Sequence, residues 1–247
     1  FVHFPYNNNP LDSFVNQLGI ATIPANFNNE AVFSVNHTLY SDGDLASSET
    51  VFNQFLDFVS WQMYTNLTTD APVSDTLASF WTTNTPAAVV KDRVNQKLQA
   101  EAVDNAAELS KMSTFYFGSN RQKDGLDYTP ASGCASLVQM IFNQKCAPDL
   151  HLSETVISID YTGSTIIVTT NLAQYTTNHL FVGVSLGMLK VNQIQFNPPL
   201  PSEKQQAINA IGFGAYEKIF VTFDKSFWPA GKNTLNFVGK GLPSRYV

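Results

Sequence analysis

The chain has 247 residues, of which 44% are hydrophobic and 14% are charged, and its net charge is −6. This length and apolar content are sufficient for a buried core and for one or two domains. The acidic balance, without a Lys/Arg cluster, argues against nucleic-acid binding, and no apolar run approaches the roughly 20 residues of a membrane helix.

The first segment predicts a short amphipathic helix. Asp12 or Ser13 is a candidate cap, and the residues that follow place their apolar side chains on one inner face (Phe14, Val15 and Leu18). Residues 36–40 and the turn Ser41–Asp44 then predict a hairpin-like excursion.

Three helices are expected next, over residues 48–66, 74–81 and 86–110, because apolar residues recur at helical spacing. The short aromatic run 113–117 is a strand candidate, and a polar surface loop is expected to follow it over residues 118–129.

A helix is expected after Gly133, and residues 149–170 predict two strands around the turn at residues 162–164. If one helix joins Cys134 to Cys146, its twelve residues hold the two sulfurs roughly 18 Å apart. A disulfide needs Cα atoms within about 7 Å, so we expect two thiols.

The last third predicts a buried strand over residues 181–186 and an extended connector through Pro198, Pro199 and Pro201. A helix over residues 204–211 follows, with one apolar stripe that we expect to be buried. Residues 219–223 alternate in the manner of a half-buried strand.

Three runs in this region occur in a characteristic order: SLGMLK from Ser185, IQFNPPLPSEKQQAI from Ile194 and IGFGAYEKIFVTFDKSFW from Ile211. Together they resemble the flavin-dependent amine oxidase family, which includes polyamine oxidases, monoamine oxidases and lysine-specific histone demethylases. The resemblance implies hydride transfer from an amine to N5 of the flavin, followed by reoxidation by oxygen with release of peroxide.

The resemblance implies a catalytic role for Lys218, which matches a family lysine that holds a water near N5 of the flavin. A cation on a flexible stem can position water there, and it can assist reoxidation, during which negative charge develops. The alternative is a solvated strand lysine.

Two further positions match cofactor contacts of the family. His3 falls where the family has a histidine near the flavin, although Phe4 stands in place of the usual glycine. Val156 matches the strand valine whose backbone meets the adenine of FAD. The alternatives are a solvated histidine near the chain end and an ordinary core valine.

The sequence has no G-x-G-x-x-G turn for the pyrophosphate of a dinucleotide, so we do not expect this chain alone to hold FAD tightly. We expect the missing flavin-domain segments or a companion chain to complete the site around a small-molecule amine. A polyamine would suit the acidic balance. The alternative is a non-catalytic binding or structural module that keeps the scaffold without the cofactor half.

We therefore expect a mixed α+β fold in three segments. Residues 1–117 form a mainly helical part of the substrate domain, residues 118–190 part of the FAD-binding domain, and residues 191–247 a strand–helix–strand part of the substrate domain. Because the chain opens on Phe1, we expect a processed or excised segment. Sequons at Asn36 and Asn66 favour a secreted or endomembrane protein.

Overall fold

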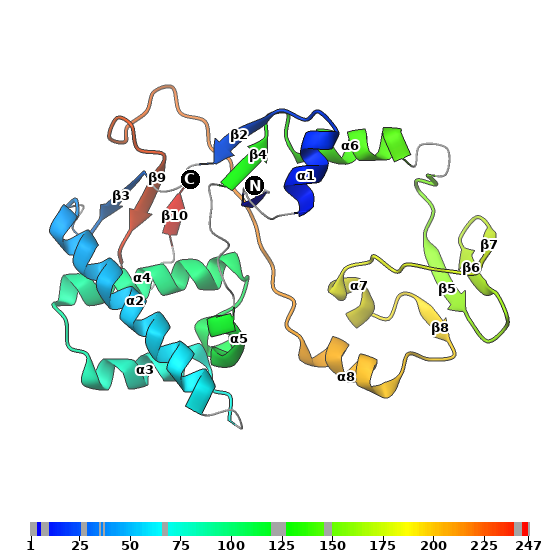
Figure 1. The fold of residues 1–247 in the computed structure, drawn as a ribbon, viewed down its shortest axis with the longest axis horizontal. Helices are drawn as coiled ribbons and strands as arrows, with labels where there is room; N and C mark the ends of the chain where they lie inside the picture. The colour runs from blue at the N-terminus through cyan, green and yellow to red at the C-terminus, as the bar shows by residue number, and fades with distance from the viewer. Residues whose placement is uncertain are drawn as a thin grey trace. The chain divides into compact units, whose positions relative to one another are not determined.

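The fold is that of a computed structural model, which describes residues 4–5, 10–25, 29–34, 36, 38–65, 69–119, 127–145, 150–239 and 244–246 (Figure 1). The chain divides into two compact units. Unit 1 comprises residues 1–141 and 216–247, and unit 2 comprises residues 142–215.

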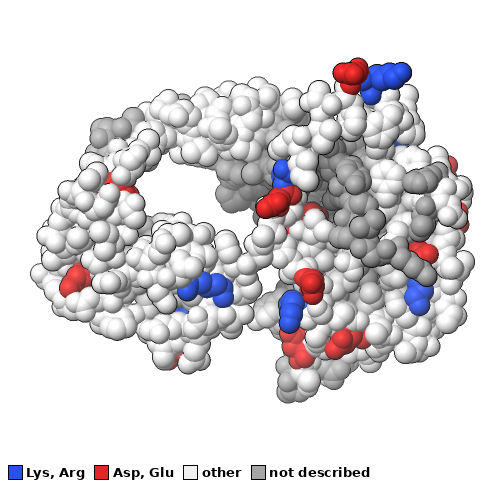
Figure 2. Space-filling model, turned by 180° about the vertical axis from the view of Figure 1, so that it is seen from behind, with Lys and Arg blue, Asp and Glu red and all other residues white. Residues whose placement is uncertain are grey.

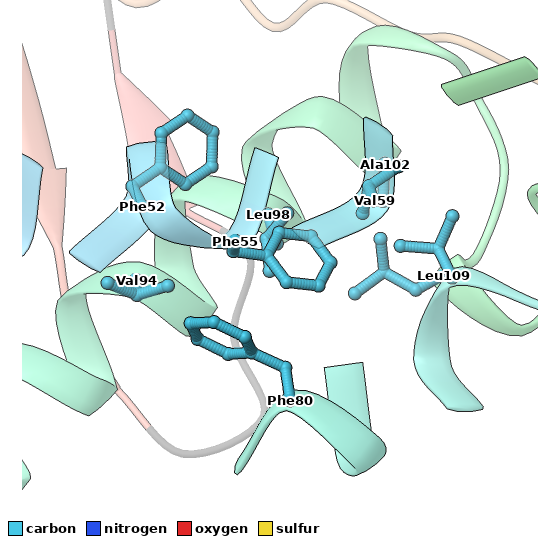
Figure 3. Close-up of a cluster of buried hydrophobic side chains, with 9 residues drawn as sticks. Phe52, Phe55, Val59, Phe80, Val94, Leu98, Ala102 and Leu109 are labelled. Carbon is cyan, nitrogen blue, oxygen red and sulfur yellow. The ribbon is translucent and has the colours of Figure 1, made fainter. Parts of the chain in front are cut away.

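The largest part of unit 1 is a group of helices: α2 (Asp42–Thr65), α3 (Val73–Thr83), α4 (Ala88–Asp104), the 3₁₀ turn η1 (Leu109–Lys111) and α5 (Thr114–Ser119). Helix α2 packs against α3, α4 and α5. These helices enclose the main apolar core, in which the ring of Phe55 lies edge-on to Phe80 at 5.4 Å between centroids (Figure 3). The three helices expected over residues 48–110 are therefore confirmed, with corrected ends.

Helix α2 begins six residues earlier than expected, at Asp42, within the segment that we had interpreted as a turn. Ser41 explains the difference, because its Oγ accepts a hydrogen bond of 3.1 Å from the backbone N–H of Asp44. That hydroxyl satisfies an N–H group that a helix start otherwise leaves without an intrahelical partner. Asp42 and Asp44 then place negative charge at the positive end of the helix dipole.

The aromatic run 113–117, expected as a strand, instead belongs mainly to helix α5. Ser113 Oγ accepts from the N–H of Tyr116 at 3.1 Å, and Asp70 Oδ1 accepts from the N–H of Phe115 at 3.1 Å. These two acceptors stabilise a helix start, which the aromatic composition alone did not reveal. Helix α4 is also shorter than expected, because the chain turns at Asn105 and Ala106 before η1.

The described residues of unit 1 also form two small sheets. Strand β4 (Asp127–Pro130) pairs in antiparallel fashion with β1 (Phe4–Pro5) and with β2 (Thr22–Ala25). Helix α1 (Pro10–Gln17) buries Val15 in a cluster with Leu137 of helix α6 (Cys134–Lys145). The predicted amphipathic helix and the predicted helix after Gly133 are thereby confirmed, but α1 begins at Pro10, so the candidate caps Asp12 and Ser13 lie inside the helix. Cys146 lies outside the described residues, so the two thiols stay a prediction.

The second sheet has the order β10–β9–β3. Strand β3 (Glu30–Phe33) runs parallel to β9 (Thr234–Phe237), 204 positions later in register, and β10 (Ser244–Tyr246) pairs with β9 in antiparallel fashion. The N–H of Tyr40 donates to the carbonyl of Val32 at 2.8 Å, so the chain folds back on β3 as expected of a hairpin-like excursion, whereas the predicted turn Ser41–Asp44 leads into α2.

Unit 2 contains a sheet of order β7–β6–β5–β8, formed by β5 (Val156–Asp160), β6 (Ile166–Thr170), β7 (Gln174–Thr177) and β8 (Gln195–Asn197). Strands β5 and β6 are the predicted pair around residues 162–164, whereas β7 was not predicted. Helices α7 (Leu186–Lys190) and α8 (Ser202–Ala210) flank β8 in the sequence. The proline connector lies between β8 and α8, as predicted.

Two predicted strands are absent from the described residues. Residues 181–185 and 219–223 have no strand partner there, and their large apolar side chains are exposed. A strand is stabilised by pairing, so an alternating pattern is insufficient where no neighbour is present. The apolar stripe of α8 was also wrong as a buried face, because only Ile208 is half-buried among the α8 residues.

The structure confirms the mixed α+β class. The two compact units do not share their bounds with the three predicted segments. The assignment of residues 1–117, 118–190 and 191–247 to substrate and flavin domains stays a prediction.

Candidate functional site

Lys218 lies in a long extended segment between α8 and β9, where every residue from 211 to 231 is exposed. Its Nζ atom lies 5.6 Å from the centroid of the Tyr216 ring, within the range of a cation–π contact. The ring and the ammonium group thus lie together, two residues apart in the chain. The segment therefore exposes a positive charge beside an aromatic ring.

The residues directly after Lys218 are apolar and exposed. Phe220 is 84% exposed, and Ile219 and Val221 are also accessible. Exposed apolar surface is unfavourable by roughly 25 cal/mol per Å², and a contiguous exposed run marks a surface that another element covers. The segment that bears Lys218 therefore carries a contiguous run of exposed apolar side chains.

A second aromatic group follows in the same segment. The rings of Phe223, Phe227 and Trp228 lie edge to face, with Phe227 and Trp228 separated by 5.1 Å between centroids. Phe227 and Trp228 line a hollow of about 200 Å³ together with residues of β3 and β9 (Phe33, Leu235 and Phe237). Lys218 is not among the residues that line this hollow.

Val156, the predicted adenine contact, is the first residue of β5 in unit 2. It pairs with Thr170 of β6, and the register shifts by one residue between Val156 and Ser158. On the other edge of β5, pairing with β8 starts only at Ser158. The edge at Val156 therefore has no strand neighbour on that side among the described residues. Such an edge can form main-chain hydrogen bonds with a planar ligand, which is what the predicted contact with an adenine requires.

The structure does not bring the predicted site residues together in one unit. Lys218 belongs to unit 1 and Val156 to unit 2. His3 lies outside the described residues. Sequence reasoning missed Tyr216 beside Lys218, although aromatic residues two positions from a strand lysine share its face. It also missed the hydrogen-bonded side chains of Glu154 and Tyr175, which come together only through the pairing of β5, β6 and β7.

The charged side chains at the surface do not indicate a particular kind of ligand. On the face shown in Figure 2, Lys and Arg side chains lie scattered among Asp and Glu, and most of the described surface is uncharged. Within the described ranges, no group of three or more His, Cys, Asp or Glu side chains is arranged to hold a metal ion. Among the same residues, none of the helices combines the length and apolar character that crossing a bilayer requires.

Comparison with known families gives one match along almost the whole chain. The family described as "Flavin containing amine oxidoreductase" matches residues 2–246. Among curated proteins, lysine-specific histone demethylase 1B of Mus musculus is 40% identical over 97 residues, which cover 39% of this chain and 12% of that protein. Polyamine oxidase 1 of Zea mays is 38% identical over 86 residues, which cover 34% of this chain and 17% of that protein.

A longer alignment and a solved structure extend the comparison. Lysine-specific histone demethylase 1 homolog 1 of Arabidopsis thaliana is 27% identical over 237 residues, which cover 90% of this chain and 27% of that protein. A putrescine oxidase double mutant superposes with a TM-score of 0.63 at 14% identity, over 84% of this chain and 51% of that one. At this identity the likeness shows the fold alone. The chain thus corresponds to about half of the solved enzyme structures that it resembles.

Proposed function

The chain belongs to the family of flavin-containing amine oxidoreductases, and we propose that it forms part of an enzyme that oxidises an amine with FAD. The observation that carries the proposal is the family match over residues 2–246, which includes Lys218 within the run IGFGAYEKIFVTFDKSFW. The amine oxidases and demethylases among the relatives support the same class of reaction.

Bound FAD would supply the acceptor for the hydride that leaves the carbon next to the amine nitrogen. In our proposal, Lys218 holds a water molecule by hydrogen bonding from its Nζ, and its positive charge stabilises the negative charge that develops during reoxidation by oxygen. Tyr216, whose ring lies 5.6 Å from Nζ, orients the lysine side chain.

We propose that the backbone edge of β5 at Val156 holds the adenine. Support comes from the absence of a strand neighbour on the β8 side before Ser158. His3 remains a second proposed contact with the cofactor. The turn that would bind the pyrophosphate is absent from this sequence, so other polypeptide must contribute it.

The proposed partner of this chain is the remainder of the enzyme, in the same polypeptide or in a companion chain. The exposed apolar residues after Lys218 support this proposal, because a complete fold would cover them. The length comparison supports it as well, since the chain matches about half of a putrescine oxidase.

The proposed substrate is a small amine, and a polyamine is favoured. Support comes from polyamine oxidase 1 of Zea mays among the relatives. The net charge of −6 would attract a polycation over distance, although it selects no particular amine.

A secretory route is proposed from the two sequons. Asn36 lies exposed in the turn before Tyr40, where a glycan can be attached without disturbing the core. Asn66 lies outside the described residues. Loss of mass after glycosidase treatment of the native protein would support this route, whereas an unchanged mass would argue against it.

The proposal is tested on the full-length protein that contains this chain, purified from its native source. We expect the absorbance of an oxidised flavin, bleaching of that absorbance on anaerobic addition of spermidine or putrescine, and peroxide release in air. A colourless protein would instead favour a non-catalytic module. A flavoprotein that no amine from a panel reduces would contradict the proposed reaction but not the cofactor.

A further inference from the structure

Glu154 carries a nearly buried carboxylate that has no part in the function proposed so far. Its side chain is 7% exposed and lies just before β5. The hydroxyl of Thr170, at the end of β6, donates to Oε1 at 2.5 Å. The hydroxyl of Tyr175, in β7, lies 2.9 Å from both carboxylate oxygens. This one carboxylate therefore accepts hydrogen bonds from β6 and β7 next to the start of β5.

The neighbouring residue is fixed as well. The N–H of Thr155 donates to Oδ1 of Asn171 at 2.8 Å, and the N–H of Asn171 donates to the carbonyl of Thr155 at 3.0 Å. Glu154 and Thr155 are therefore both hydrogen-bonded to the chain around the β6–β7 turn. The next residue is Val156, whose partner in the β5–β6 ladder is Thr170.

Val156 lies outside the regular part of the pairing of β5 with β6 and β8. The register shifts between Val156 and Ser158, and a bulge of this kind changes the direction of the strand. Pairing with β8 starts only beyond the bulge. The hydrogen bonds of Glu154 and Thr155 thus add to the pairing with Thr170 in holding Val156 at the start of the strand.

The protonation states suit this role. Hydrogen bonds from Thr170 and Tyr175 lower the pKa of Glu154, and the hydrogen bond to Glu154 raises the pKa of Tyr175. At neutral pH the carboxylate therefore accepts while the phenol donates. The third titratable group of the cluster is His151, whose exposed ring places Nδ1 3.4 Å from Glu154 Oε2 and 3.2 Å from the Tyr175 hydroxyl oxygen.

We propose that Glu154 is a positioning residue for FAD: it holds the backbone edge at Val156 in the place where the adenine binds, through its bonds to Thr170 and Tyr175. This inference rests on the proposed function, because it assumes that the full-length protein binds FAD. It extends that function to side chains that do not touch the cofactor.

The test compares FAD affinity and stability in the full-length protein. Glu154→Gln keeps the shape of the side chain but replaces one acceptor oxygen with an NH₂ group that opposes a hydroxyl donor. The matched control is Glu203→Gln, which changes an exposed glutamate in the first turn of α8. The measurements are the dissociation constant of FAD by titration of the apoprotein and the melting temperature of the apoprotein. Tyr175→Phe, which removes only the hydroxyl, is measured in parallel.

We expect Glu154→Gln to weaken FAD binding about tenfold and Tyr175→Phe to weaken it in the same direction, while both apoproteins melt at somewhat lower temperature but stay folded at the temperature of the titration. The control should bind FAD as the wild type does. Unchanged FAD affinity in both variants would overturn the proposal. So would apoproteins of both variants that are already partly unfolded at the temperature of the titration, since the loss of affinity would then report a structural role alone. If the wild-type protein binds no FAD, the proposed function itself fails.

Discussion

Arg93 of α4 donates a hydrogen bond of 2.5 Å from Nη2 to Oε1 of Glu30 in β3. The Arg93 side chain is 6% exposed and that of Glu30 31% exposed. The second carboxylate oxygen of Glu30 accepts from Nδ2 of Asn236 in β9 at 2.5 Å, and Gln96 of α4 contacts both Arg93 and Asn236. This polar network joins the helices of unit 1 to the parallel pair β3–β9, and β9 directly follows the segment that carries Lys218.

The network predicts a large cost for removing one partner. Glu30→Gln leaves the buried guanidinium of Arg93 without its counter-charge, and we expect a loss of about 2–3 kcal/mol in the free energy of unfolding, measured by urea titration. The matched control is Glu49→Gln. Glu49 is exposed on α2 and pairs with Lys97, which lies in α4 as Arg93 does. That change should cost less than about 1 kcal/mol. Equal losses in the two variants would contradict the role assigned to the network.

The start of α2 provides a second prediction. Ser41→Ala removes the hydroxyl that accepts from the N–H of Asp44, so we expect a loss of about 1 kcal/mol in the free energy of unfolding. Ser47→Ala, at an exposed position inside the same helix, should be neutral or slightly stabilising, because alanine is the better helix former. If Ser41→Ala is also neutral, the helix start does not depend on this cap.

The cluster around Glu154 predicts a dependence of stability on pH. The pKa of Glu154 is lowered in the folded state from its ordinary value of 4.5. The carboxylate therefore contributes stability that is fully present above pH 4.5 and is lost as the pH falls through the folded pKa, because the unfolded chain then binds more protons. Chemical unfolding between pH 3 and 7 should show a steeper acid loss for the wild type than for Glu154→Gln. Identical profiles would show that Glu154 is not stabilised in its charged form.

The helices were the most predictable part of the fold. The stripe that contains Phe55 and Val59 gave α2 its correct inner face, since both side chains are fully buried. The ends of the helices were less predictable, because they depend on single hydrogen bonds such as those accepted by Ser41 and Ser113. The aromatic run around Phe115 is compatible with a strand or a helix, and the hydrogen bond accepted by Ser113 distinguishes the two.

Strand pairing could not be predicted from local sequence patterns. Strands β3 and β9 lie about 200 positions apart and are short, so neither has a periodicity that identifies it. The opposite error occurred at Ile219–Phe223, where the alternation is clear but no partner strand is present among the described residues. In the full-length protein we expect this segment to pair, and hydrogen exchange at its amides should be slow there. Rapid exchange throughout would contradict its burial by the rest of the enzyme.

The candidate site was predictable only where a sequence run carries it. Lys218 was singled out by its place within a long motif, and no composition or spacing argument would have selected it. Glu154 and Tyr175 were not found, because they lie 21 residues apart and meet only through the order of β5, β6 and β7. Residues that depend on sheet topology for their contacts require the structure.

The proposed role of Lys218 in flavin chemistry is tested by rapid-reaction kinetics of Lys218→Met in the full-length enzyme. Lys225→Met, an exposed lysine of the same segment, is the matched control. Lys218→Met should slow reoxidation of the reduced flavin by oxygen about 100-fold or more, while FAD stays bound and the control reacts as the wild type does. Wild-type rates of flavin reduction and reoxidation in Lys218→Met would contradict the proposed role.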